Sequence, residues 1–93
     1  MKLSQDEIDL ELQIMRGWTL DGRQIKRTIH FETFTEAINF INKIAQEAER
    51  AGHHPDILIK YNNVTFTLTT HSENGLTEKD FALAKRIDEI LGR

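Results

Sequence analysis

The chain has 93 residues, of which 39% are hydrophobic and 29% charged, and its net charge is −3. This length and composition indicate one domain spanning residues 1–93, and the acidic balance argues against a dedicated nucleic-acid-binding protein. Because the chain has no cysteine and no apolar run of the ~20 residues that cross a bilayer, disulfides, thiolate metal sites and a membrane-spanning helix are excluded. The N-terminus also lacks the basic start and apolar stretch of a signal peptide, so we expect a cytoplasmic protein without a membrane partner.

A short helix and a hairpin are expected first along the chain. A capping box at residues 4–7 predicts a helix over about residues 5–15. Apolar and polar residues then alternate over residues 23–31, which indicates a β-strand. The Asp21-Gly22 pair ahead of this strand favours a type I′ turn, so we expect the strand to pair with residues 18–20.

The longest helix is expected next, between a second capping box at residues 33–36 and Gly52. Its apolar residues recur at helical spacing, which predicts one buried stripe. The stripe comprises Phe34, Ala37, Ile38, Ile41, Ile44, Ala45 and Ala48. Phe40 lies off this stripe, which indicates a second contact surface such as a subunit interface.

The second half of the chain predicts another hairpin and a final helix. Strand alternation returns at residues 57–61 and 64–69, on either side of an Asn62-Asn63 turn. After a loop, Thr77 is expected to cap the final helix, with Asp80 at the N3 position. The order α-β-β-α-β-β-α therefore predicts an α+β fold, in which a four-stranded antiparallel sheet has helices packed on one face.

Three of the four histidines follow the predicted end of an element. His53 and His54 follow the long helix, and His71 follows the last strand. Imidazole has an unperturbed pKa of about 6.5, so it both takes and gives a proton near neutral pH. Three rings around one cavity would therefore suit acid–base catalysis, and Glu49 would orient a ring or bind a ligand N–H group. The fourth histidine, His30, lies on the polar side of its strand and is interpreted as a surface residue.

These residues also admit other interpretations. Zinc often takes three histidine ligands, although the neighbours His53 and His54 tend to point apart and the i, i+4 spacing of helical ligands is absent. The histidines could equally be ordinary loop residues. Asp80 is explained as a capping carboxylate without any catalytic role. Neither a Ser-His-Asp arrangement nor a glycine-rich phosphate loop is present.

Four segments, in order and spacing, are specific enough to resemble a known family. They are Glu49-x-x-x-His53-His54-Pro55, Tyr61-Asn62-x-Val64, Leu68-x-Thr70-His71 and Gly75-Leu76-Thr77-x-x-Asp80. With them the whole chain resembles the pterin-4a-carbinolamine dehydratases, whose fold is α+β. The resemblance implies an enzyme that dehydrates 4a-hydroxytetrahydrobiopterin to quinonoid dihydropterin and water, in tetrahydrobiopterin recycling, with neither a metal nor a cofactor.

The resemblance also assigns roles to individual residues. His53 and His71 would be the general acid–base pair, and His54 would take part mainly by holding the pterin. Pro55 and Glu49 would line the pterin site, with Glu49 contacting ring nitrogens or steering a histidine. Asp80 would contact the substrate or support His71.

Two further expectations follow from the resemblance. Many relatives carry a tryptophan where this chain has Ile57, and losing that aromatic wall should weaken stacking on the pterin by ~1 kcal/mol. Relatives also form dimers or tetramers, so a homo-oligomer is expected. Some animal members act as a dimerisation cofactor for a homeodomain transcription factor, and a non-catalytic protein-interaction module is therefore the alternative function.

Overall fold

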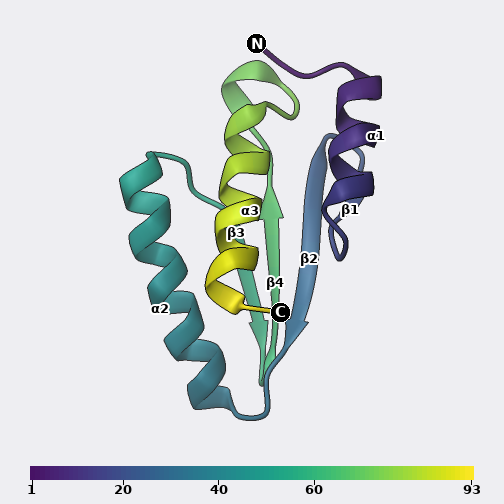
Figure 1. Ribbon diagram of the computed structural model, residues 1–93. Helices are drawn as coiled ribbons and strands as arrows, with labels where there is room; N and C mark the ends of the chain where they lie inside the picture. The colour runs from purple at the N-terminus through teal and green to yellow at the C-terminus, as the bar shows by residue number, and fades with distance from the viewer.

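The computed structural model describes all 93 residues and confirms the predicted α+β fold and order of elements (Figure 1). The elements are α1 (Gln5–Ile14), β1 (Thr19–Asp21), β2 (Gln24–His30), α2 (Phe34–Ala51), β3 (Asp56–Lys60), β4 (Asn63–Leu68), a 3₁₀ helix (His71–Glu73) and α3 (Glu78–Leu91). None of the helices combines the length and the apolar character that a bilayer crossing requires.

The four strands form one antiparallel sheet in the order β1-β2-β4-β3. In Figure 1 all three helices lie over one face of this sheet, with α3 across its middle, α2 on one side and α1 on the other. The opposite face is polar, as the alternation of β2 and β4 predicts, and there Thr28 and Thr65 share a hydrogen bond of 2.7 Å between their hydroxyl oxygens. The β3 strand lies at the edge of the sheet.

The core lies between the sheet and the helices. Every second residue of β2 and β4 faces α3, and burial of each such large side chain contributes roughly 1.5–3 kcal/mol. The fully buried side chains include Ile25, Ile44, Val64, Phe66, Leu68, Leu76, Phe81 and Ile87. The centre of the sheet and α3 therefore form most of the core, and the candidate site lies beside them.

The prediction that Phe40 lies off the buried stripe of α2 is wrong. Phe40 is only 6% exposed, and its ring centroid lies 5.3 Å from that of Phe31 and 5.8 Å from that of Phe66. Phe34 and Ala45, which were assigned to the buried stripe, are exposed. Apolar residues cover more than one face of α2, so periodicity alone does not reveal which face meets the sheet.

The first hairpin turn lies one residue later than predicted, and the second lies one residue earlier. The first consists of Gly22 and Arg23, and because only Gly22 has a positive φ, of 65°, it is not the expected type I′ turn. The second consists of Tyr61, with a φ of 53°, and Asn62. The Asn62 side-chain amide donates to the Phe31 carbonyl at 2.7 Å, a tertiary contact that the local sequence does not reveal.

The helix caps follow the sequence closely. The capping boxes predicted at residues 4–7 and 77–80 are both present. At α2 only half of the predicted box forms, because the Glu36 amide donates to Thr33 Oγ1 at 3.1 Å while the Glu36 side chain makes no return bond. The box at α3 matters most for the site, since its carboxylate faces the interior.

Candidate functional site

The C-terminal end of α2 directs the chain so that His53 points inward. Gly52 adopts the left-handed conformation with φ 63° and ψ 28°. The Gly52 amide donates to the Glu49 carbonyl at 3.3 Å and the His53 amide donates to the Ala48 carbonyl at 3.2 Å, which is the pair of bonds of a Schellman motif. The motif reverses the chain over the helix end and leaves the His53 side chain only 11% exposed.

A buried carboxylate, that of Asp80, lies at the centre of the site. Asp80 is 0% exposed, and its Oδ1 lies 2.5 Å from His53 Nε2. Its Oδ2 accepts from the Thr70 hydroxyl at 2.8 Å and from the Thr77 amide at 2.9 Å. A buried charge needs such partners to remain favourable. One carboxylate therefore joins the end of α2, the end of β4 and the start of α3.

The shared carboxylate also brings together the two histidine-bearing segments. His53 and Thr70 bind the two oxygens of one carboxyl group, and His71 directly follows Thr70. Thr70 has an extended backbone with φ −111° and ψ 95° and a buried side chain, whereas His71 is exposed and its ring makes no hydrogen bond or ion pair. Asp80 therefore binds His53 directly and reaches the segment of His71 through the neighbouring Thr70.

The next residue, His54, pairs with Glu49. His54 Nε2 and Glu49 Oε2 form a hydrogen bond, and both side chains are exposed. Pro55 follows as a half-buried residue ahead of β3. An exposed pair of this kind contributes little to stability, about 0–1 kcal/mol. The pair lies next to the helix end that carries His53.

A cavity of about 360 Å³ lies between α2 and α3 and ends at His53. This volume falls within the roughly 300–1,000 Å³ that is usual for small-molecule sites. The lining residues are Glu47, Arg50, Ala51, His53, Lys79, Ala82, Leu83 and Arg86. We call this cavity the α2–α3 groove.

Four of the eight residues that line the α2–α3 groove are charged. Arg86 Nε donates to Glu47 Oε1 at 2.6 Å, and Arg50 binds the other oxygen of the same carboxylate. The Arg86 guanidinium holds the pKa of Glu47 below its ordinary value, and Glu47 in turn raises the pKa of Arg86. The Lys79 ammonium makes no hydrogen bond or ion pair. The groove is therefore positively charged.

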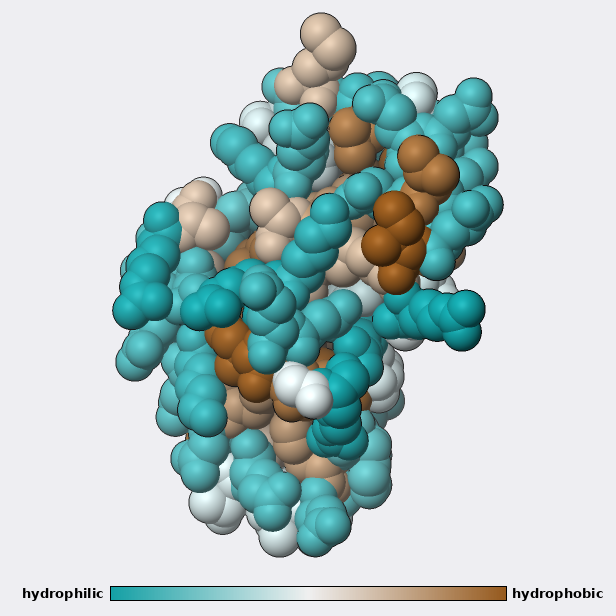
Figure 2. Space-filling model, in the orientation of Figure 1, coloured by the Kyte–Doolittle hydropathy of each residue, from teal (hydrophilic) through white to brown (hydrophobic).

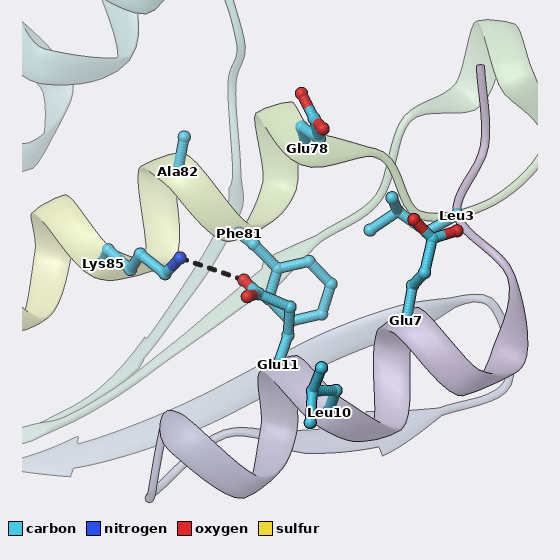
Figure 3. A pocket seen from close by; sticks show the side chains of 8 residues that line it. All are labelled: Leu3, Glu7, Leu10, Glu11, Glu78, Phe81, Ala82 and Lys85. Carbon is cyan, nitrogen blue, oxygen red and sulfur yellow. Dashed lines mark ion pairs between the residues drawn. The ribbon is translucent and has the colours of Figure 1, made fainter.

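A larger cavity, of about 440 Å³, lies on the other side of α3, against α1 (Figure 3). Phe81 forms part of its lining, and Lys85 Nζ reaches across it to Glu11 Oε2 at 3.0 Å. Figure 2 shows apolar side chains exposed over α1, where Leu10 and Ile14 are 60% and 68% exposed. This cavity contains no histidine, so it is not the candidate catalytic site.

Comparison with known proteins identifies the family. A model of the family described as pterin 4 alpha carbinolamine dehydratase matches residues 1–90. The chain belongs to this family. A relative from Sulfurisphaera tokodaii is 49% identical over 90 residues and one from Nostoc is 51% identical over 88, with at least 95% of each chain covered. Both bear the name of the same dehydratase family.

Two solved structures have a similar fold. A protein from Brucella melitensis, described as a transcriptional coactivator/pterin dehydratase, is 39% identical, with a TM-score of 0.92 over 97% of this chain and 98% of that one. A pterin dehydratase-like protein described as a RuBisCO assembly factor of the α-carboxysome is 24% identical, with a TM-score of 0.71 over 83% and 92%. The second likeness concerns the fold alone.

Sequence reasoning missed two residues of this candidate site, Thr70 and Lys79. Thr70 is buried and its hydroxyl lies 2.8 Å from that of Thr77, so both threonines belong to the network around Asp80. The signal in the sequence was the position of Thr70, which continues the spacing of the inward-facing residues Val64, Phe66 and Leu68 but carries a hydroxyl group. Lys79 was also overlooked, although a cation in the first turn of a helix opposes the helix dipole.

Proposed function

We propose that this protein dehydrates a 4a-hydroxytetrahydropterin, such as 4a-hydroxytetrahydrobiopterin, to the quinonoid dihydropterin and water. The observation that carries the proposal is the bond between His53 and the buried Asp80 at the end of a cavity of small-molecule size. Membership of the pterin carbinolamine dehydratase family supports the class of reaction. The reaction would serve tetrahydrobiopterin recycling.

The elimination needs one base and one acid. The base removes the proton from the ring nitrogen bonded to C4a, and the electron pair of that N–H bond forms the C=N double bond. The C4a–O bond then breaks, and the acid protonates the departing hydroxide to give water. Positioned acid–base groups of this kind each contribute about 10²–10⁴-fold to the rate.

The Asp80 bond suggests which role His53 takes. A carboxylate accepts hydrogen bonds, so Nε2 of His53 carries the proton that points to Asp80. The lone pair of the neutral ring is then on Nδ1, which would remove the substrate proton. His71, whose ring is exposed and makes no bond within the protein, would act as the acid. His54, Glu49 and Pro55 would hold the pterin at the mouth of the site.

The decisive experiment measures the decay of the carbinolamine. A hydroxylase generates the compound, and its ultraviolet absorbance is followed with and without the protein. We expect the carbinolamine to decay faster with the protein. The catalysed rate should fall by about 10²-fold or more in His53→Ala and in His71→Ala. His30→Ala, which changes an exposed histidine bonded to Asn63, is the control and should leave the rate unchanged. If the carbinolamine decays no faster with the wild-type protein than in buffer alone, the enzyme proposal fails. The alternative, a non-catalytic protein-interaction module, then remains.

We also propose that the protein forms a homo-oligomer. Phe40 no longer supports this, but the edge strand β3 exposes 37% of Ile57 and 54% of Leu58. An apolar edge strand with free backbone groups is a common site of strand pairing. Sedimentation analysis should therefore find a dimer or tetramer, and Leu58→Lys should shift the mass toward the monomer. A monomeric wild type at micromolar concentration would contradict the proposal.

A further inference from the structure

The side chains that line the α2–α3 groove carry a net positive charge, which proton transfer at His53 does not need. Three cations, those of Arg50, Lys79 and Arg86, line the groove with a single carboxylate, that of Glu47. Both guanidinium groups bind this one carboxylate. The ion pairs therefore leave an excess of positive charge beside the ring of His53.

Lys79 is the cation of the groove that no protein group neutralises. Its ammonium makes no ion pair, and its neighbour Asp80 points away from it into the network with His53. Lys79 also lies in the first turn of α3, where the partial positive charge of the helix disfavours a cation. The carboxylates of Glu78 and Asp80 already meet the positive helix end in this turn, so Lys79 itself is the group that favours an anion at this end of the groove.

We propose that the α2–α3 groove binds an anionic group on the side chain of the pterin, with the ring near His53 and the anion near Lys79. This inference rests on the proposed function, which supplies the pterin. The anion would be a phosphate monoester or a carboxylate, because both accept charge-assisted hydrogen bonds from ammonium and guanidinium groups. The cavity beside α1 has the opposite character, since Glu7, Glu11 and Glu78 line it.

Equilibrium binding of stable pterins tests the proposal without any turnover. The probes are 6-hydroxymethylpterin, its phosphate ester and pteroylglutamate, titrated by calorimetry at low salt. We expect the phosphate ester to bind about five- to tenfold more tightly than the neutral pterin, since exposed charge contacts are worth up to about 1 kcal/mol each. In 0.5 M salt the preference should shrink, because screening weakens exposed charge pairs.

Two matched variants of α3 localise the effect. Lys79→Gln should remove most of the preference for the anionic probe and leave the affinity for the neutral pterin unchanged. Lys85→Gln removes the same charge from the opposite side of α3, where Lys85 pairs with Glu11, and should keep the preference. If pteroylglutamate also binds more tightly than the neutral pterin, the groove is a general anion subsite. If only the phosphate ester does, the groove is a phosphate subsite. Either result supports the proposal.

The results that would contradict the anion subsite differ from those that would contradict the dehydratase activity. If the phosphate ester binds no tighter than the neutral pterin, if no probe binds, or if the two lysine variants lose the preference equally, the groove is not an anion subsite. Turnover of the neutral carbinolamine is measured separately. Absent turnover together with a Lys79-dependent preference would contradict the dehydratase proposal and leave the anion subsite standing.

Discussion

The most informative residue of this molecule is Asp80, because it has two functions at once. Its Oδ2 closes the capping box of α3 through the Thr77 amide, and its Oδ1 binds His53. Capping alone does not require a buried carboxylate, since the capping box of α1 is complete although it is exposed. The burial makes the bond to His53 insensitive to solvent, and so a fixed orientation of the imidazole follows.

Asp80→Asn tests this double role. The amide keeps the size of the side chain but offers one acceptor oxygen to three donors, those of His53, Thr70 and Thr77. We expect the free energy of unfolding to fall by about 1–3 kcal/mol, as measured by urea denaturation. The turnover number should fall by about tenfold or more, with a smaller change in KM, because the base loses its orientation rather than the substrate its contacts.

A control in the same helix separates stability from catalysis. Asp88 also accepts bonds from two distant side chains, but it lies away from the α2–α3 groove. Asp88→Asn should lose comparable stability and keep its turnover number at temperatures where the protein is folded. Equal loss of turnover in the two variants would mean that Asp80 acts only through the fold.

At the scale of elements, Asp88 attaches the first hairpin to α3. Its carboxylate accepts from Trp18 Nε1 at 3.0 and 3.1 Å and from Arg27 at 2.6 Å. Arg27 lies on the helix-facing side of β2, where an unpaired guanidinium would be unfavourable. Gly17 lets the chain pass close to this guanidinium, since a Cβ there would lie 3.0 Å from Arg27 Nε. Two elements far apart in the sequence thus depend on one carboxylate.

The indole of Trp18 provides a direct measurement of that attachment. Asp88→Asn should lower the free energy of unfolding by about 1–3 kcal/mol and shift the emission of the native protein to longer wavelength, because the single amide oxygen cannot hold both the indole and the Arg27 guanidinium as the carboxylate does. Trp18 is the only tryptophan of the chain, so the tryptophan emission reports on the surroundings of this one indole. Asp21→Asn breaks an exposed pair with Lys26 and should lower the stability much less than Asp88→Asn does, because solvent screens an exposed pair. Equal costs for both variants would contradict the assignment.

For the whole molecule, the pairing of Glu47 with Arg86 and Arg50 ties stability to pH. The hydrogen bond from Arg86 is the main cause that lowers the pKa of Glu47 from its ordinary value of 4.5. Because the folded pKa lies below the unfolded one, the stabilisation is complete above pH 4.5 and disappears as the pH falls through the folded pKa. Acid should therefore loosen the contact between α2 and α3.

The urea midpoint measured between pH 7 and pH 3 checks this linkage. The wild type should lose stability below about pH 4.5, and Glu47→Gln should lose less over the same interval, because it has no carboxylate to protonate there. If the two proteins follow parallel curves, Glu47 does not contribute to the acid sensitivity of the fold. The Ser4 amide also lowers the pKa of Glu7. Protonation of Glu7 therefore lowers the stability of both proteins as the pH falls.

The sequence by itself determined the features that depend on neighbouring residues. The capping boxes of α1 and α3, the end of α2 at Gly52 and the alternation of β2 and β4 all arise within a few residues of chain, where the preference of each residue type is decisive. The order of elements and the α+β fold follow from them. So does the grouping of His53, His54 and His71 at the ends of elements, and with it the resemblance to the pterin-4a-carbinolamine dehydratases.

Only the tertiary structure decided which surfaces and side chains meet. Packing against Phe31 and Phe66 placed Phe40 in the core, since α2 is apolar on more than one face. The approach of α3 to the end of α2 gave His53, not His71, the bond to Asp80. The charge of the α2–α3 groove likewise arises between two helices. Contacts between distant segments depend on how whole elements pack, and no local preference encodes that.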